Sequence, residues 1–172
     1  LASLKEPFVF VVVGEVNTGK STFLNALFGQ DFSKTGVMPT TDKVLYFKHG
    51  PETLISPITP TLVEVQVPAD FLRDFHIVDT PGTNSIESEH QVITERFVPV
   101  ADLVIFVFSA MNPWGASAWQ FLEKVHRDWM RNVVFVLQQS DLRSPEEIQV
   151  ISDYMAELCR ARFVREFPLF QI

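Results

Sequence analysis

The sequence is poor in cysteine, in basic residues and in long apolar runs. Its single cysteine, Cys159, excludes an internal disulfide bond, as is usual in a reducing compartment. No run of 18 apolar residues occurs, so no segment is predicted to cross a bilayer as a helix. The 14 Lys and Arg residues are outnumbered by 21 Asp and Glu residues, which gives a net charge of −7. An acidic domain lacks the electrostatic footprint of a nucleic-acid-binding protein and is not drawn to an anionic membrane by itself.

The length and composition predict one globular domain. The chain has 172 residues, of which 47% are hydrophobic and 20% charged. Because the sequence begins at Leu1 rather than Met, we expect it to be a piece of a longer protein. The apolar residues 7–13 lead into a glycine loop rather than a cleavage site, so no signal peptide is expected. The four histidines show no metal-ligand spacing and receive no role.

Strand and helix patterns alternate along the chain. Short apolar runs at 8–13, 103–108 and 133–137 predict strands buried on both faces. Further strands are expected at 44–49 and 75–78, and an edge strand at 61–67, where polar and apolar residues alternate. Helical patterns cover 20–28, 87–97, 117–131 and 145–162, and three prolines mark 50–60 as a loop. The pattern predicts a three-layer α/β/α fold with a mostly parallel six-stranded sheet, followed by a short strand at 167–172.

The strongest motif is a glycine-rich loop at 14–21 that matches G-x-x-x-x-G-K-S between a predicted strand and a helix. In such a loop the backbone N–H groups turn inward around phosphates, and the helix N-terminus adds partial positive charge. Lys20 is predicted to reach the β- and γ-phosphates, and the Ser21 hydroxyl to bind Mg²⁺. We assign nucleotide binding to Gly14, Glu15, Val16, Asn17, Thr18, Gly19, Lys20, Ser21 and Thr22.

A second motif, Asp-Thr-Pro-Gly, follows the strand predicted at 75–78. An acid at this strand end holds Mg²⁺ in P-loop enzymes, often through water, so Asp79 is the candidate. The N–H of Gly82 can then face the γ-phosphate. An ordinary Asp-x-Pro-Gly turn is the alternative interpretation.

A third motif, Gln138-Gln139-Ser140-Asp141, follows the strand predicted at 133–137. GTPases carry Asn/Thr-Lys-x-Asp here, and the Asp accepts two hydrogen bonds from guanine that adenine cannot supply. Asp141 fits that role, and the alternative is a surface turn acid. Gln138 and Gln139 depart from the pattern, so Asp141 is the residue of this motif on which guanine preference depends.

A threonine before the strand at 44–49 is the fourth element. In GTPases this hydroxyl completes the Mg²⁺ shell only when the γ-phosphate is present, which makes its loop a switch. Thr40 and Thr41 both occur in the loop, and Thr41 is preferred because it lies nearer the strand. The predicted catalytic group is Lys20, Thr41 and Gly82, and the predicted Mg²⁺ ligands are Ser21, Thr41 and Asp79.

These four elements, in order, resemble the GTPase fold. Residues 13–27 and 36–41 are similar to bacterial dynamin-like proteins of the mitofusin/Fzo type, and residues 77–84 and 97–102 are similar to the plastid Fzo-like branch. The resemblance implies a GTP-hydrolysing domain in a larger membrane-remodelling protein that is cytoplasmic and peripheral to a membrane. It implies partners of three kinds: GTP or GDP, other G domains, and a membrane contacted by regions outside this chain. The fifth GTPase motif is expected after Ile172.

The sequence leaves the catalytic water without an assigned partner, because Thr83 and Val16 stand where other GTPases carry Gln. Two other classes remain open: an Era-like ribosome-assembly GTPase, and a nucleotide-gated switch with little hydrolysis. Asn17 resembles the P-loop Asn of potassium-activated GTPases, so a K⁺ or Na⁺ site is one hypothesis for it and a loop-stabilising amide is the other. Trp114 is either an interface anchor or packed beneath its loop.

Overall fold

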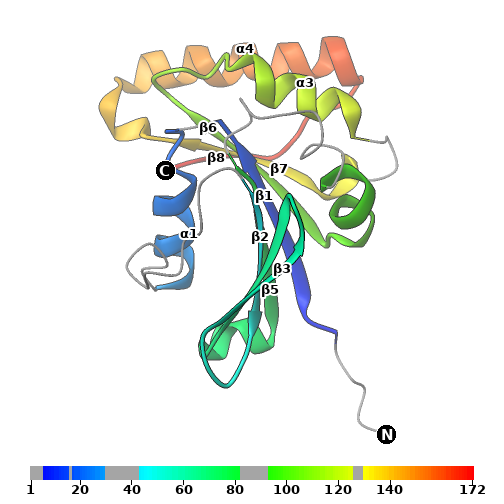
Figure 1. The fold of residues 1–172 in the computed structure, drawn as a ribbon. Helices are drawn as coiled ribbons and strands as arrows, with labels where there is room; N and C mark the ends of the chain where they lie inside the picture. Colours follow the sequence, from blue (N-terminus) through cyan, green and yellow to red (C-terminus); the bar gives the residue numbers. More distant parts are fainter. Residues whose placement is uncertain (1–5, 16, 30–42, 82–92, 126–129) are drawn as a thin grey trace, which may run out of the picture.

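The computed structural model describes residues 6–15, 17–29, 43–81, 93–125 and 130–172. The described elements form three layers, as predicted, with one sheet between helices on its two faces (Figure 1). The strands are β1 Phe8–Gly14, β2 Val44–His49, β3 Leu54–Thr59, β4 Leu62–Val67, β5 Phe75–Asp79, β6 Leu103–Ser109, β7 Val133–Gln138 and β8 Leu169–Gln171. The α-helices are α1 Lys20–Phe28, α3 Ala116–Lys124 and α4 Pro145–Phe163.

The sheet has eight described strands, in the order β3-β4-β2-β5-β1-β6-β7-β8. The six-stranded prediction is therefore wrong in number, but the sheet is mostly parallel as expected. Antiparallel pairing occurs between β3 and β4 and between β2 and β5, and the other neighbours run parallel. The parallel centre is built from β5, β1, β6 and β7, so the carboxyl ends of these strands meet at one edge.

The prediction of a loop at 50–60 is also wrong, because strand β3 forms within this range. Pro57 lies within β3, which is the terminal strand of the described sheet and pairs with β4 on one side alone. Proline is tolerated on such a strand because its missing N–H need not serve a second neighbour. The pairing is irregular between Pro57 and Thr59. Consequently β4, predicted as the edge, lies inside the sheet between β3 and β2.

The helix predictions are confirmed in part. Helix α1 matches its predicted range, and α4 begins at the predicted cap, where Ser144 and Glu147 exchange hydrogen bonds in a capping box. The helix predicted over 117–131 is too long. Helix α3 ends at Lys124, because Val125 turns extended (φ −71°, ψ 125°), and a short 3₁₀ turn follows at Met130–Asn132. Of the helix predicted over 87–97, only the turn Ile93–Phe97 lies within the described residues.

Apolar side chains fill both faces of the sheet. Helices α3 and α4 cover one face and α1 covers part of the other (Figure 1). The core beneath α3 and α4 is aromatic: Phe135 contacts Phe106, Phe108 and Trp119, with ring centroids 5.1–6.0 Å apart. Cys159 of α4 lies in this core and is 2% exposed. The candidate site lies at the carboxyl ends of the strands that this core supports.

Candidate functional site

The predicted motifs follow strands that are neighbours in the sheet. Val12 of β1 is in register with Asp79 of β5, Gly14 with Val107 of β6, and Ser109 of β6 with Gln138 of β7. The glycine-rich loop, the Asp79 motif and the Gln138 loop therefore emerge side by side from one edge. A Cβ added at Gly19 would lie 3.5 Å from Cδ of Gln138, so the first and third motifs are in contact range.

The glycine-rich loop has the geometry of a phosphate cradle. Gly14 is required by space, since a Cβ there would lie 2.5 Å from the carbonyl oxygen of Val107. Gly19 has φ +87°, and Asn17 adopts the left-handed region with φ +64°. Thr18 is buried and donates its hydroxyl to the carbonyl of Glu15 at 2.9 Å. Such a turn directs successive backbone N–H groups into a concavity where an anion can bind.

Lys20, the first residue of α1, lies inside this loop. Its Nζ donates to the carbonyl oxygens of Gly14 at 2.9 Å and of Glu15 at 3.0 Å. Burial lowers the pKa of Lys20, while the carboxylates of Asp79 and Glu15 oppose that change. Ser21 and Thr22 follow in the first turn of α1 and are exposed. The lysine therefore sits at the positive end of a helix with two carbonyl contacts that a phosphate could replace.

Asp79 ends β5 beside this lysine. Burial raises the pKa of its carboxyl to about 6, and the Lys20 charge and a hydrogen bond from the Thr80 N–H oppose that rise. Its Oδ1 is shielded from solvent and has no hydrogen-bond partner among the described residues. Thr80 anchors the strand end by donating its hydroxyl to the carbonyl of Val12 at 2.9 Å. A buried carboxylate oxygen without a donor calls for a cation to balance it.

The residues present fit a magnesium ion. In the part of the chain that the structure describes, no group of three or more His, Cys, Asp or Glu side chains could hold a metal. Mg²⁺ does not need such a group when nucleotide is present, because it is commonly held by one or two protein oxygens together with phosphates and water. Asp79 and Ser21 would supply those oxygens at the edge where the phosphates would lie.

The loop after β7 carries the predicted base-binding residues. Gln139 has φ +64°, and its side-chain oxygen accepts a hydrogen bond from the hydroxyl of Ser109. Ser140 donates its hydroxyl to the carbonyl of Leu137 at 2.9 Å, and its N–H bonds to the carbonyl of Ile172 at 3.0 Å. Asp141 is exposed, in the 3₁₀ turn Ser140–Leu142. The loop is thus fixed by β6 and by the residue after β8, and it leaves the Asp141 carboxylate free to meet a ligand.

Two contacts at this edge were not predicted. The Glu15 carboxylate accepts hydrogen bonds from the N–H of Ser117 at 3.2 Å and from the Ser117 hydroxyl. The Ser109–Gln139 bond is the second. Both join residues far apart in sequence, so no local pattern signals them. The predicted residues Val16, Thr40, Thr41, Gly82 and Thr83 lie outside the described residues.

Comparison with known proteins gives the family. Residues 9–139 match the family described as 50S ribosome-binding GTPase. The chain belongs to this GTPase family. It is 39% identical to the "Probable transmembrane GTPase FZO-like, chloroplastic" of Arabidopsis thaliana, over 93% of this chain and 18% of the plant protein. It is 32% identical to the isoniazid-induced protein IniC of Mycobacterium tuberculosis, over 64% of this chain and 29% of that protein.

Solved structures agree on the fold. Two structures of an oligomerised bacterial dynamin pair match 98–99% of this GTPase chain, with TM-scores of 0.77 and 0.78 at 16% identity. The translation elongation factor SelB from Methanococcus maripaludis matches with a TM-score of 0.57. The resemblance to dynamin-like GTPases and the P-loop GTPase fold are therefore confirmed. The domain spans 18% of the plant relative's length, so most of that protein has no counterpart here. Among the described residues, the helices are too short or too polar to cross a membrane.

Proposed function

We propose that this domain binds GTP together with Mg²⁺ and hydrolyses it, as the nucleotide-driven part of a dynamin-like membrane-remodelling protein. The observation that supports it most is that the Lys20 ammonium and the Asp79 carboxylate lie at the same sheet edge, close enough to influence each other electrostatically, while Oδ1 of Asp79 has no hydrogen-bond partner among the described residues. The first provides positive charge for phosphate, and the second a ligand for the accompanying metal.

Binding would replace contacts that the structure already contains. Lys20 would exchange the carbonyls of Gly14 and Glu15 for the oxygens of the β- and γ-phosphates. The N–H groups from Asn17 to Ser21 would surround the phosphates, with the positive end of α1 behind them. Ser21 and Asp79 would hold Mg²⁺, Asp79 directly or through a water. When bound, that ion spreads the negative charge that develops on the phosphate oxygens.

Hydrolysis requires a water placed in line with the γ-phosphorus. Lys20 and the loop amides would stabilise charge that grows on the phosphate oxygens as the bond to the leaving group breaks. Thr41 and Gly82 are proposed to face the γ-phosphate from the two switch segments. Asp141 would accept hydrogen bonds from guanine, with Gln138 and Gln139 beside the base. Their amides replace the usual Asn and Lys, so guanine selection would rest mainly on Asp141.

Asn17 is proposed to bind a monovalent cation near the phosphates. Asn17 lies in the glycine-rich loop next to the buried Thr18, has a left-handed backbone with φ +64°, and is exposed. A K⁺ or Na⁺ ion there would neutralise charge as an arginine finger does. Phosphate release measured in KCl, NaCl and CsCl tests this role, and equal rates in the three salts would contradict it.

The membrane role rests on the relatives. The bacterial dynamin pair is described as oligomerised and as sensing and tethering membranes, and the plant relative is named as a transmembrane GTPase. We propose that the present domain self-associates with other G domains and that regions outside these 172 residues contact a membrane.

One experiment tests the core of the proposal. Calorimetry should show Mg²⁺-dependent binding of GTP and GDP by the wild-type protein and its loss in Lys20→Ala. Single-turnover phosphate release then separates a GTPase from a switch with little hydrolysis, and a comparison with and without liposomes tests the membrane role. Nucleotide binding that is absent from the wild type, or unchanged in Lys20→Ala, would overturn the proposal.

A further inference from the structure

Four apolar side chains form a continuous exposed patch beside the candidate site. They are 45–67% exposed and come from the loop after β6 and from α4: Met111, Trp114, Val150 and Tyr154. The rings of Trp114 and Tyr154 meet edge to face at 4.5 Å, and Tyr154 lies one helical turn after Val150. Single exposed apolar residues are normal on a protein surface, whereas contiguous ones with charged neighbours mark contact sites. We call these four residues the Trp114 patch.

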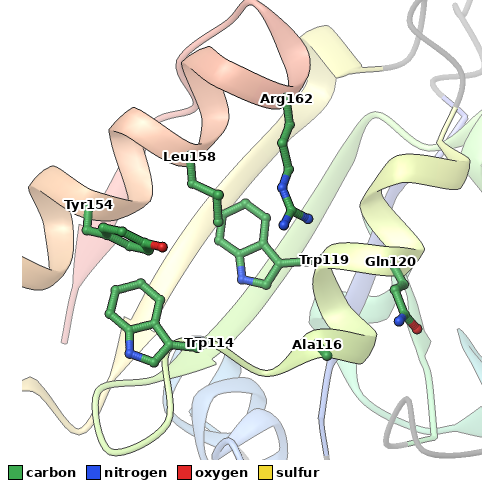
Figure 2. Close-up of a pocket in the computed structure, with 7 residues that line it drawn as sticks. All are labelled: Trp114, Ala116, Trp119, Gln120, Tyr154, Leu158 and Arg162. Atoms are coloured by element: carbon green, nitrogen blue, oxygen red, sulfur yellow. The ribbon is translucent and has the colours of Figure 1, made fainter.

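Trp114 lines two hollows in this surface. The first has a volume of about 520 Å³ and lies between α3 and α4, and Figure 2 shows Trp114 and Tyr154 at one end of it. The second has a volume of about 440 Å³ and lies between the loop after β6 and the start of α4; its lining includes Met111, Trp114, Arg143, Glu146 and Val150. Both volumes are typical of sites that hold an organic group. The surface therefore combines an exposed aromatic ring with a recess that can receive one.

The loop that carries Trp114 is held in place by hydrogen bonds. The N–H of Met111 donates to the Ser109 hydroxyl at 3.1 Å. The indole N–H of the buried Trp119 donates to the carbonyl of Pro113 at 3.4 Å. An aromatic side chain on a fixed loop loses little conformational entropy when it binds, which suits an interface anchor. Both predicted roles for Trp114 keep support, since the ring is packed on one side and still half-exposed.

Charges of both signs lie at the rim of the second hollow. Arg143 forms an ion pair with Glu147 in the first turn of α4 at 3.2 Å, and its side chain remains 33% exposed. Glu146 is exposed, and hydrogen bonds from its own N–H and from Ser144 lower its pKa, so it is ionised at neutral pH. A surface that meets a second copy of itself about a two-fold axis needs both signs, because each charge then faces its opposite.

We propose that the Trp114 patch is the surface through which two copies of this domain associate about a two-fold axis. This proposal rests on the self-association included in the proposed function. Trp114 of each copy enters the second hollow of the other. Because Trp114 also lines that hollow, the two rims come face to face. Arg143 of one copy then pairs with Glu146 of the partner subunit, and the same pair forms again across the axis.

Analytical ultracentrifugation over a concentration series, with and without Mg²⁺ and a non-hydrolysable GTP analogue, measures the dissociation constant of the dimer. Trp114→Ala should raise this constant by at least about 30-fold, as the loss of a residue at the energetic centre of an interface does. Phe170→Ala is the matched control, because Phe170 is an aromatic residue of similar exposure, 56%, on β8 and outside the patch. Its variant should dimerise as the wild type does.

A charge exchange tests the two-fold arrangement. Arg143→Glu and Glu146→Arg should each weaken the dimer by at least about tenfold. The double variant should recover most of that loss, because both members of the pair are exchanged in both copies. Arg73→Glu and Asp70→Arg are the matched controls: this ion pair, at 3.2 Å, lies on the turn before β5, and each reversal changes the net charge by the same amount. They should change the dissociation constant little.

The outcomes separate this proposal from the proposed function. A dimer that keeps its wild-type strength in Trp114→Ala, or that Phe170→Ala weakens as much, overturns the assigned surface and leaves self-association intact. A double charge variant no stronger than the single ones overturns the two-fold pairing. A wild type that stays monomeric while calorimetry shows nucleotide binding overturns self-association and the patch together. A wild type that dimerises through the patch without binding nucleotide upholds the patch and overturns the GTPase proposal.

A second variant covers the case in which Trp114→Ala does not fold. If circular dichroism shows such a loss, Val150→Asp replaces it. Val150 is 67% exposed on α4, so the fold should tolerate the change, while a charge in the middle of the patch should abolish the dimer. A dimer of wild-type strength in Val150→Asp overturns the assigned surface in the same way.

Discussion

Replacing Asp79 by an asparagine should stabilise the nucleotide-free domain while it destroys the metal site. The pKa of this carboxyl is raised to about 6 from an ordinary value of 3.8, chiefly by burial. At neutral pH Asp79 is ionised, and its charge is less favourable in the folded state than in the unfolded state. This lowers the free energy of unfolding by about 3 kcal/mol, since each unit of pKa shift corresponds to about 1.4 kcal/mol. The amide of the Asp79→Asn variant would keep the shape of the side chain and remove the charge.

The raised pKa of Asp79 makes the stability of the folded state depend on pH. The folded state binds the proton more tightly than the unfolded state, so stability falls as pH rises from about 4 to 6 and is constant above that range. Asp79→Asn should escape this loss. Its melting temperature should exceed that of the wild type by roughly 6–12 °C at pH 8, and by about half as much at pH 5.

Thermal unfolding monitored by circular dichroism at pH 5 and pH 8, without nucleotide or metal, measures this effect. Asp74→Asn, which changes an exposed carboxylate just before β5, is the matched control and should show little difference at either pH. The same Asp79→Asn protein should lose the Mg²⁺-dependent part of its nucleotide affinity. A variant that melts at or below the wild-type temperature at pH 8, or whose advantage is the same at both pH values, would refute the reasoning.

Other substitutions test the remaining parts of the site and fold. Asp141→Ala should weaken GTP binding by about 10- to 100-fold, because hydrogen bonds to a charged acceptor contribute about 1.5–3 kcal/mol, and fluorescence titration with GTP and ATP should show the guanine preference shrinking. Equal loss for both nucleotides would contradict its role in base selection. Ser144→Ala should cost about 1 kcal/mol by removing the capping box of α4, seen as a lower urea midpoint with an unchanged slope. Phe135→Ala should cost about 3–5 kcal/mol, because the ring is 1% exposed among other aromatics; a smaller loss in the same urea assay would mean that the core closes around the cavity.

The sequence predicts those parts of the structure that depend on local pattern. Strand β1 and helix α1 are predicted within one residue, because a continuous apolar run, a glycine loop and a helical repeat follow each other directly. The capping residues of α4 are equally local. Strand β3 is missed because Pro57 within it, with Pro51 and Pro60 on either side, indicates a loop, and only the place of β3 at the end of the described sheet makes Pro57 acceptable.

The motifs of the candidate site can be predicted from the sequence, but the hydrogen bonds between residues distant in the sequence cannot. The glycine-rich loop, Asp79 and Asp141 each follow a strand at a recognisable spacing. The contact from Glu15 to Ser117 and the bond from Ser109 to Gln139 depend on how the crossovers bring strand ends together, which single segments do not specify. Gln139 is an example. The sequence shows only that it replaces the usual lysine, whereas the structure shows that its side chain accepts a hydrogen bond from Ser109 of β6.

The single thiol of the chain is unreactive while the domain is folded. Cys159 is 2% exposed, and burial raises its pKa to about 12, so it forms almost no thiolate at neutral pH. A cysteine introduced on the surface could therefore be labelled selectively without first removing the native one. When the domain unfolds, the same thiol becomes ordinary and reacts. The protein thus carries a built-in chemical probe of its own global opening, which can be read by the rate of alkylation with no added dye.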